Sequence, residues 1–141
     1  MPFHFSLNSL LDLRRSEQRQ QEFILQKENA KVNSLCRKIA NLEQDISQMI
    51  NVPPHGRIGA ELRFDQERQI LLEQQRAQFR EQLESAREQQ KLATAALTRA
   101  WQKREALEIL RRREYVGYSL NERRREQRRQ DDWFMQQRHT R

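Results

Sequence analysis

The sequence has very little of what a compact globular fold needs. Its 141 residues include only three glycines and three prolines, and hydrophobic residues make up 35% of the chain. Strands need turns rich in glycine and proline, together with runs of β-branched and aromatic residues, so a β-sheet is not expected. Glutamine, arginine and glutamate dominate instead, a composition typical of long solvent-exposed helices. The length indicates a single domain, residues 1–141.

The residues that build chemical sites are also scarce. The single cysteine, Cys36, excludes an internal disulfide and fits a reducing compartment. The three histidines are far apart in the sequence, so no Cys/His spacing indicates a metal site. A glycine-rich phosphate loop is absent. We therefore expect no cofactor, no metal and no catalytic residue, and we interpret the chain as a non-enzymatic protein.

Segments that direct a protein into or across a membrane are not visible either. No apolar run approaches the roughly 18 residues that a membrane-spanning helix needs. The first residues lack the basic stretch and long apolar block of a secretory signal. These two absences predict a cytoplasmic protein.

What the sequence does have is a regular spacing of apolar residues. Between Val32 and Met49 they recur at alternating intervals of three and four, the pattern of a coiled-coil seam. A second stretch with this spacing follows the only internal cluster of helix breakers, which surrounds Pro53. We predict an all-α fold of two long helices in an antiparallel coiled-coil hairpin, with the second helix overhanging at the C-terminus. The predicted elements are a helix over about 4–51, a turn at about 52–59 and a helix over about 60–138.

The three–four spacing also predicts which residues form the seam between the helices. They are Leu25, Val32, Leu35, Ile39, Leu42, Ile46 and Met49 on the first helix, and Leu62, Leu72, Phe79, Leu83, Ala86, Ala93, Leu97 and Ala100 on the second. The two patterns align when Val32 meets Phe79, which also places Gln21 opposite Gln90. Polar seam positions such as Gln90 lower stability and help to fix a register. A shift by one heptad keeps the patterns in phase and remains an alternative.

Positive charge is concentrated near the C-terminus. Residues 110–141 contain ten basic and five acidic side chains, so they carry +5 of the net charge of +7. In the register above, residue 4 lies opposite Leu107, and the second helix continues beyond about residue 110 without a partner helix. Its apolar side chains there are candidates for a binding face: Leu110, Tyr115, Val116, Tyr118 and Leu120. An uncovered basic helix predicts an acidic partner at this end.

Two arginine runs are the most conspicuous feature of this region. They comprise Arg111, Arg112, Arg113, Arg123, Arg124, Arg125, Arg128 and Arg129. The planar guanidinium group suits carboxylates on an acidic protein surface, which is the interpretation we favour. Neutralisation of nucleic-acid phosphates is an alternative, but interleaved glutamates such as Glu114 and Glu126 would repel a phosphate backbone. A plain solvated helix is the third interpretation.

Exposed aromatic and aliphatic residues are expected at two places. Trp133 and Phe134 lie near the end of the chain, where they could anchor an interface; the alternative is that this end folds back onto the hairpin. Phe64, Ile70 and Leu71 lie near the turn but off the seam, so they predict a second apolar patch.

The two ends of the chain resemble those of a known family. Residues 5–15 (FSLNSLLDLRR) and 123–132 (RRREQRRQDD) are similar to the ends of the FliJ family, small coiled-coil proteins of the bacterial flagellar type III export apparatus. The length, the hairpin turn and the arginine- and glutamine-rich end agree with this likeness, which covers the whole chain. The related stalk proteins of virulence injectisomes have the same architecture and are an alternative.

The resemblance implies a stalk. Members of the family resemble the central shaft of rotary ATPases, bind the hexameric export ATPase, contact the membrane export gate and help to cycle export chaperones. On this chain, the arginine runs with Trp133 and Phe134 become candidates for binding the ATPase, and Phe64, Ile70 and Leu71 become candidates for the gate. The resemblance also implies an elongated monomer that serves flagellum biogenesis and motility. It would lie in the cytoplasm at the periphery of the inner membrane, without bound nucleic acid.

Overall fold

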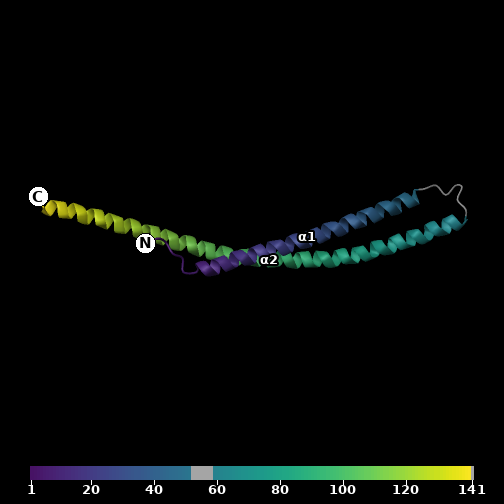
Figure 1. The fold of residues 1–141 in the computed structure, drawn as a ribbon, viewed down its shortest axis with the longest axis horizontal. Coiled ribbons are helices and arrows are strands. Elements are labelled where there is room, and N and C mark those ends of the chain that lie inside the picture. The colour runs from purple at the N-terminus through teal and green to yellow at the C-terminus, as the bar shows by residue number, and fades with distance from the viewer. Residues whose placement is uncertain (52–58, 141) are drawn as a thin grey trace. The chain divides into compact units, whose positions relative to one another are not determined.

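The computed structural model describes residues 1–51 and 59–140. Within these residues the regular elements are two α-helices, α1 (Asn8–Ile50) and α2 (Gly59–His139), and there is no strand (Figure 1). The prediction of an all-α fold with two long helices that pack against each other is therefore confirmed. The predicted turn at about 52–59 lies almost wholly outside the described residues.

The start of α1 differs from the prediction. The helix begins at Asn8 rather than near residue 4, and residues 1–7 form a non-helical segment, here called the N-terminal strap. The backbone amide of Asn8 donates a hydrogen bond to the carbonyl of Phe5, at 3.1 Å. The strap does not continue the helix because its aromatic side chains are held by packing: Phe5 is 3% exposed, and Phe3 lies against Tyr115 of α2.

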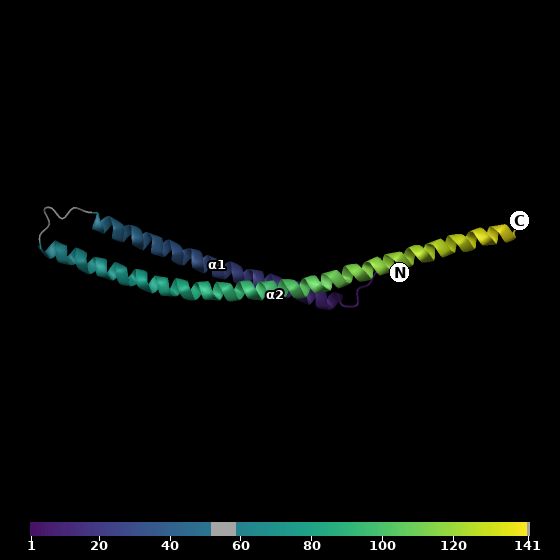
Figure 2. The same cartoon turned by 180° about the vertical axis from the view of Figure 1, so that it is seen from behind.

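The chain divides into two compact units, each of which contains part of both helices. The terminal unit comprises Met1–Arg19 and Thr98–Arg141, and the turn unit comprises Gln20–Leu97. In the turn unit the two helices run antiparallel and lie side by side in both views, as the blue and teal ribbons (Figures 1 and 2). Each unit has its own narrow core.

The core of the turn unit is a single line of side chains. Val32, Ile39, Ile46 and Ala93 are buried. All but one of the other residues that the spacing assigned to this part of the seam are half-buried. The half-buried residues are Leu25, Leu35, Leu42, Met49, Leu72, Phe79, Leu83, Ala86 and Leu97. The exception is Leu62, which is exposed like the rest of 59–64, so the seam does not extend to it.

The register differs from the favoured prediction by about one heptad. Gln90 does not lie opposite Gln21; its Nε2 donates a hydrogen bond to Oδ1 of Asn29, at 2.6 Å. Likewise the Nζ of Lys38, not Val32, lies over the ring of Phe79, 5.6 Å from its centroid. The shift explains Leu62 as well, because residues 59–64 of α2 now extend past Ile50, the last residue of α1, and α1 does not cover them.

The terminal unit has a core of its own. Its buried residues are Phe5, Leu11 and Ala100, and Leu11 is fully buried. Polar contacts flank this core: Arg15 donates two hydrogen bonds to Oε1 of Glu108, at 2.9 and 2.6 Å, and Arg104 donates one to Gln18. Buried apolar groups and paired charges together hold the start of α1 against α2.

Candidate functional site

The N-terminal strap determines how much of α2 is covered in the terminal unit. The ring of Phe3 lies 5.3 Å from that of Tyr115 and 5.5 Å from that of Tyr118, and the hydroxyl of Tyr118 donates a hydrogen bond to the carbonyl of Met1. The prediction that α2 lacks a partner from about residue 110 is therefore wrong by about two turns. The register accounts for the difference: Arg15 pairs with Glu108, whereas the predicted register placed residue 4 opposite Leu107, so the residues before Arg15 reach further along α2 than predicted.

Beyond the strap, α2 is uncovered. Every residue from 123 to 140 is exposed, and this range is here called the C-terminal segment. It stays helical as far as His139, and the side chains of Trp133, Phe134 and Met135 are all more than half exposed. The rings of Trp133 and Phe134 lie 5.3 Å apart, edge to face. The alternative in which this end folds back and buries its aromatic residues is wrong for the residues that the structure describes.

The charges of the C-terminal segment are mostly unneutralised. Of its arginines between 123 and 129, Arg125 forms an exposed ion pair with Glu122, at 3.4 Å. The other four form none with the described residues. An exposed ion pair one turn apart on a helix contributes at most a few tenths of a kcal/mol, so it is easily exchanged for a partner's carboxylate.

The two arginine runs surround the helix and do not form one face. Consecutive residues of an α-helix are roughly 100° apart around its axis, so Arg123, Arg124 and Arg125 point to three different sides. The same holds for Arg111, Arg112 and Arg113. The sequence predicted the exposure of these side chains, but the helical geometry shows that positive charge is presented all round α2.

The first arginine run, residues 111–113, is partly paired with neighbouring carboxylates. Arg112 forms an ion pair with Glu105, at 3.3 Å. A hydrogen bond from Arg15 lowers the pKa of Glu108 below its ordinary value, and the charges of Arg15, Arg104 and Arg111 lower this pKa further, although desolvation opposes them. These carboxylates belong to the structure of the terminal unit, so the first run has fewer free charges than the second.

The predicted patch near the turn is exposed but does not form one surface. Phe64, Ile70 and Leu71 are each more than half exposed. Phe64 and Leu71 are seven residues apart on α2 and share a face, whereas Ile70 points roughly 120° away from Phe64.

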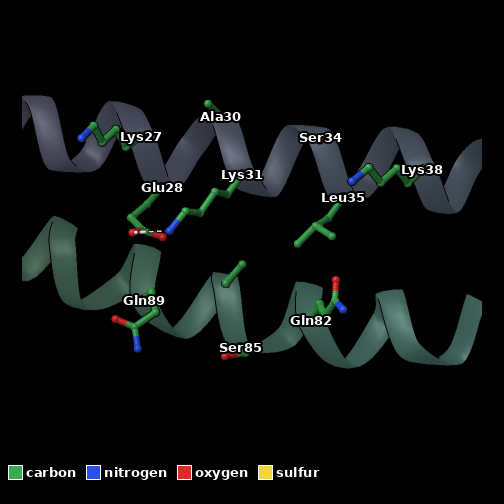
Figure 3. Close-up of a pocket in the computed structure, with 11 residues that line it drawn as sticks. Lys27, Glu28, Ala30, Lys31, Ser34, Leu35, Lys38, Gln82, Ser85 and Gln89 are labelled. Carbon is green, nitrogen blue, oxygen red and sulfur yellow. Dashed lines mark hydrogen bonds and ion pairs between the residues drawn. The ribbon is translucent and has the colours of Figure 1, made fainter.

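A groove between the helices of the turn unit was missed at the sequence level. Its α1 side carries lysines and its α2 side carries amide and hydroxyl groups, and Leu35 points from α1 toward α2 (Figure 3). The lining residues include Lys27, Lys31, Lys38, Ala30, Ser34, Gln82, Ser85, Ala86 and Gln89. Lys31 is paired with Glu28, at 3.4 Å. Alanines and serines beside a seam are the signal for such a groove, because they leave the space between two helices unfilled.

The described part of the chain offers little to other kinds of site. It contains no group of three or more histidine, cysteine, aspartate or glutamate side chains placed to hold a metal ion. Cys36 is a free, half-buried thiol. Neither helix has a stretch that is apolar enough to cross a lipid bilayer, as far as the described residues go.

Comparison with known proteins identifies the family. The model of a family described as the flagellar FliJ protein matches residues 3–141, nearly the whole chain. No curated protein and no solved structure matches significantly. The match favours the flagellar interpretation over the injectisome alternative. The chain therefore belongs to the FliJ family and is a component of the flagellar protein export apparatus.

Proposed function

We propose that the chain is a non-enzymatic stalk of the flagellar export apparatus that binds the hexameric export ATPase through its C-terminal segment. It would reach the membrane export gate through the exposed residues near the turn and escort empty export chaperones, working in the cytoplasm at the periphery of the inner membrane. The observation that carries the proposal is the complete exposure of α2 from residue 123 to residue 140, in a helix rich in arginine.

The distribution of charge supports a partner that encloses the helix. A flat acidic surface would use only the arginines of one face, but those of the C-terminal segment point in all directions. A ring of subunits presents carboxylates to every side of a helix in its centre, and Arg pairs with such carboxylates through two parallel hydrogen bonds. A hexameric ATPase matches this geometry, and the charge would also accelerate its encounter with the stalk.

The aromatic residues support a specific contact there. Trp133 and Phe134 are exposed next to each other, and large aromatic side chains are common anchors of protein interfaces. On their own they would be a liability in water, because exposed apolar surface promotes unspecific association. A binding partner that covers them removes that liability.

The assignment of the gate contact rests on exposure alone. Phe64 and Leu71 present an exposed apolar face of α2 near its start, off the seam with α1. We propose this face, flanked by Ile70, as the surface that contacts the export gate. A Phe64→Ser/Leu71→Ser variant should lose gate binding and keep ATPase binding.

Copurification with the export ATPase tests the main proposal. Reversal of the arginines at positions 123, 124 and 125 to glutamate should abolish binding and leave helicity unchanged, because these side chains are exposed. A matched control reverses three exposed arginines of the turn unit, Arg63, Arg68 and Arg87, and should retain binding. Wild-type binding should also weaken as salt is raised. Retained binding in the first variant would show that the C-terminal segment is not the docking surface.

The same variants separate the proposal from nucleic-acid binding. Contacts with phosphates would give a gel shift with duplex or single-stranded probes that falls steeply with salt. We expect no specific shift, because Glu122, Glu126 and Asp131 are interleaved with the arginines. A strong shift that is lost on reversal of residues 123–125 would favour nucleic acid over the ATPase.

A further inference from the structure

A second apolar stripe runs along α2 in the terminal unit. It consists of Trp101, Ile109, Val116 and Leu120, which are 47%, 41%, 56% and 47% exposed. At 3.6 residues per turn these four side chains fall within roughly 100° of the helix circumference. They are here called the outer stripe, because the seam residues Ala100 and Leu107 lie on a different side of the helix.

Two charged residues close the gaps in the outer stripe. Glu105 and Arg112 lie on the same face of α2 as Trp101 and Val116, and they form an ion pair with each other at 3.3 Å. Their aliphatic parts extend apolar surface between the larger residues, while their charges are mutually neutralised. The stripe is thus continuous from Trp101 to Leu120, a length of about 28 Å along the helix.

A hollow opens beside the middle of the stripe. It is lined by Phe3 of the strap and by Arg111, Arg112, Tyr115 and Val116 of α2, with a volume of about 400 Å³. Val116 and Arg112 belong to both the stripe and the hollow. Its lining combines two aromatic rings with two guanidinium groups, which suits a bulky apolar side chain that has a carboxylate next to it.

The charge around this surface indicates the kind of partner. Residues 99–125 contain nine basic and four acidic side chains, and three of the acids are engaged: Glu108 with Arg15, Glu105 with Arg112 and Glu122 with Arg125. The remaining charge is strongly positive. A second copy of this face would meet like charge, which disfavours self-association.

We infer that the outer stripe and its hollow form a docking site for an acidic amphipathic helix of another protein. About five turns of such a helix match the stripe in length. One bulky side chain would fill the hollow between Phe3 and Val116. Flanking carboxylates would pair with Arg111 and Arg113. This site is separate from the C-terminal segment, so the inference does not depend on the proposed contact with the ATPase.

A synthetic peptide tests the inference on the full-length chain. The probe is a fluorescent helix of about five turns with leucines on one face and glutamates on its flanks. The site variant is Ile109→Ser/Val116→Ser, and the matched control is Phe23→Ser/Leu92→Ser, which replaces two exposed apolar residues of the turn unit. All four side chains are exposed, and circular dichroism verifies that helicity is kept.

The expected result is saturable binding that the site variant weakens at least about tenfold and the control variant leaves unchanged. A peptide with lysines in place of the glutamates should not bind. The inference is overturned if the acidic peptide does not bind, if both peptides bind alike, or if the site variant binds as the wild type does. It is also overturned if sedimentation shows that the wild type forms a dimer and the site variant does not. The same holds if flotation shows that the wild type binds anionic vesicles and the site variant does not. The site variant should still copurify with the ATPase. This measurement separates failure of the inferred docking site from failure of the proposed ATPase contact.

Discussion

The amide of Gln90 donates a hydrogen bond to the side-chain oxygen of Asn29, at 2.6 Å, across the seam of the turn unit. Both side chains are half-buried, and they pair with each other across the seam. An unpaired amide in this position would lose about 1–3 kcal/mol of solvation without compensation. The pair therefore selects one register among those that the three–four spacing permits.

Removal of the pair should change stability and register in different ways. Asn29→Leu alone leaves the amide of Gln90 without its partner and should lower the free energy of unfolding by about 1 kcal/mol. The double variant Asn29→Leu/Gln90→Leu should recover or exceed the wild-type stability, but it should allow the helices to slip. Thermal unfolding measures the first effect. Spin labels on Cys36 and on Gln82→Cys measure the second, as a broadened distance distribution. A single narrow distance in the double variant would show that apolar packing alone fixes the register.

This pair also explains what the sequence could and could not predict about the fold. The positions of the seam follow from the spacing of apolar residues, since residues three and four apart share a helix face. The register does not follow, because a slip of one heptad superimposes the same pattern. It is decided by polar matches such as Gln90 with Asn29 and Arg104 with Gln18, and these appear only when both helices are placed together.

The candidate surfaces were predictable to different degrees. Exposure of the arginine runs follows from composition, because a dense row of charges cannot be buried. The strap was not predictable, since Phe3 and Phe5 fit a helical pattern and their packing is seen only in the folded chain. Because the strap was not predicted, Tyr115 and Tyr118 were expected to lack an internal partner. In the structure both contact Phe3. Val116 and Leu120 of the outer stripe were predicted as candidates for a binding face, but the continuation of the stripe to Ile109 and Trp101 was not, because charged residues separate its members.

Leu11 is the side chain on which the terminal unit depends most. It is the only large residue in the described part of the chain that is fully buried, while Leu13, two positions away on the same helix, is 52% exposed. Leu11→Ala should lower the free energy of unfolding by about 3 kcal/mol through lost burial and a cavity. Leu13→Ala should change it by less than about 0.5 kcal/mol. Denaturant unfolding of both variants tests this, and equal effects would contradict a core centred on Leu11.

The ion pair between Arg15 and Glu108 should make stability depend on pH. The pKa of Glu108 lies below its ordinary value of 4.5 in the folded chain, so the pair contributes fully above that value and its contribution is lost as the pH falls through the folded-state pKa. Wild type should therefore be more stable than Glu108→Gln near neutral pH, and the difference should vanish in strong acid. Unfolding midpoints over a pH series measure this. Glu81→Gln, at an exposed position, should show little difference at any pH.

Gly117 weakens α2 near the point where the strap ends. It lies inside the helix, and a methyl group added at its Cα would meet no atom within 4 Å. Gly117→Ala should therefore stabilise the helix locally by about 1 kcal/mol, because alanine loses less backbone freedom on folding than glycine does. Amide hydrogen exchange around residue 117 should slow by about fivefold, as expected for that free energy. Gly59→Ala, at the first residue of α2, should leave exchange near residue 117 unchanged. Faster exchange in Gly117→Ala would mean that the helix needs flexibility at this position to seat Tyr118 against the strap.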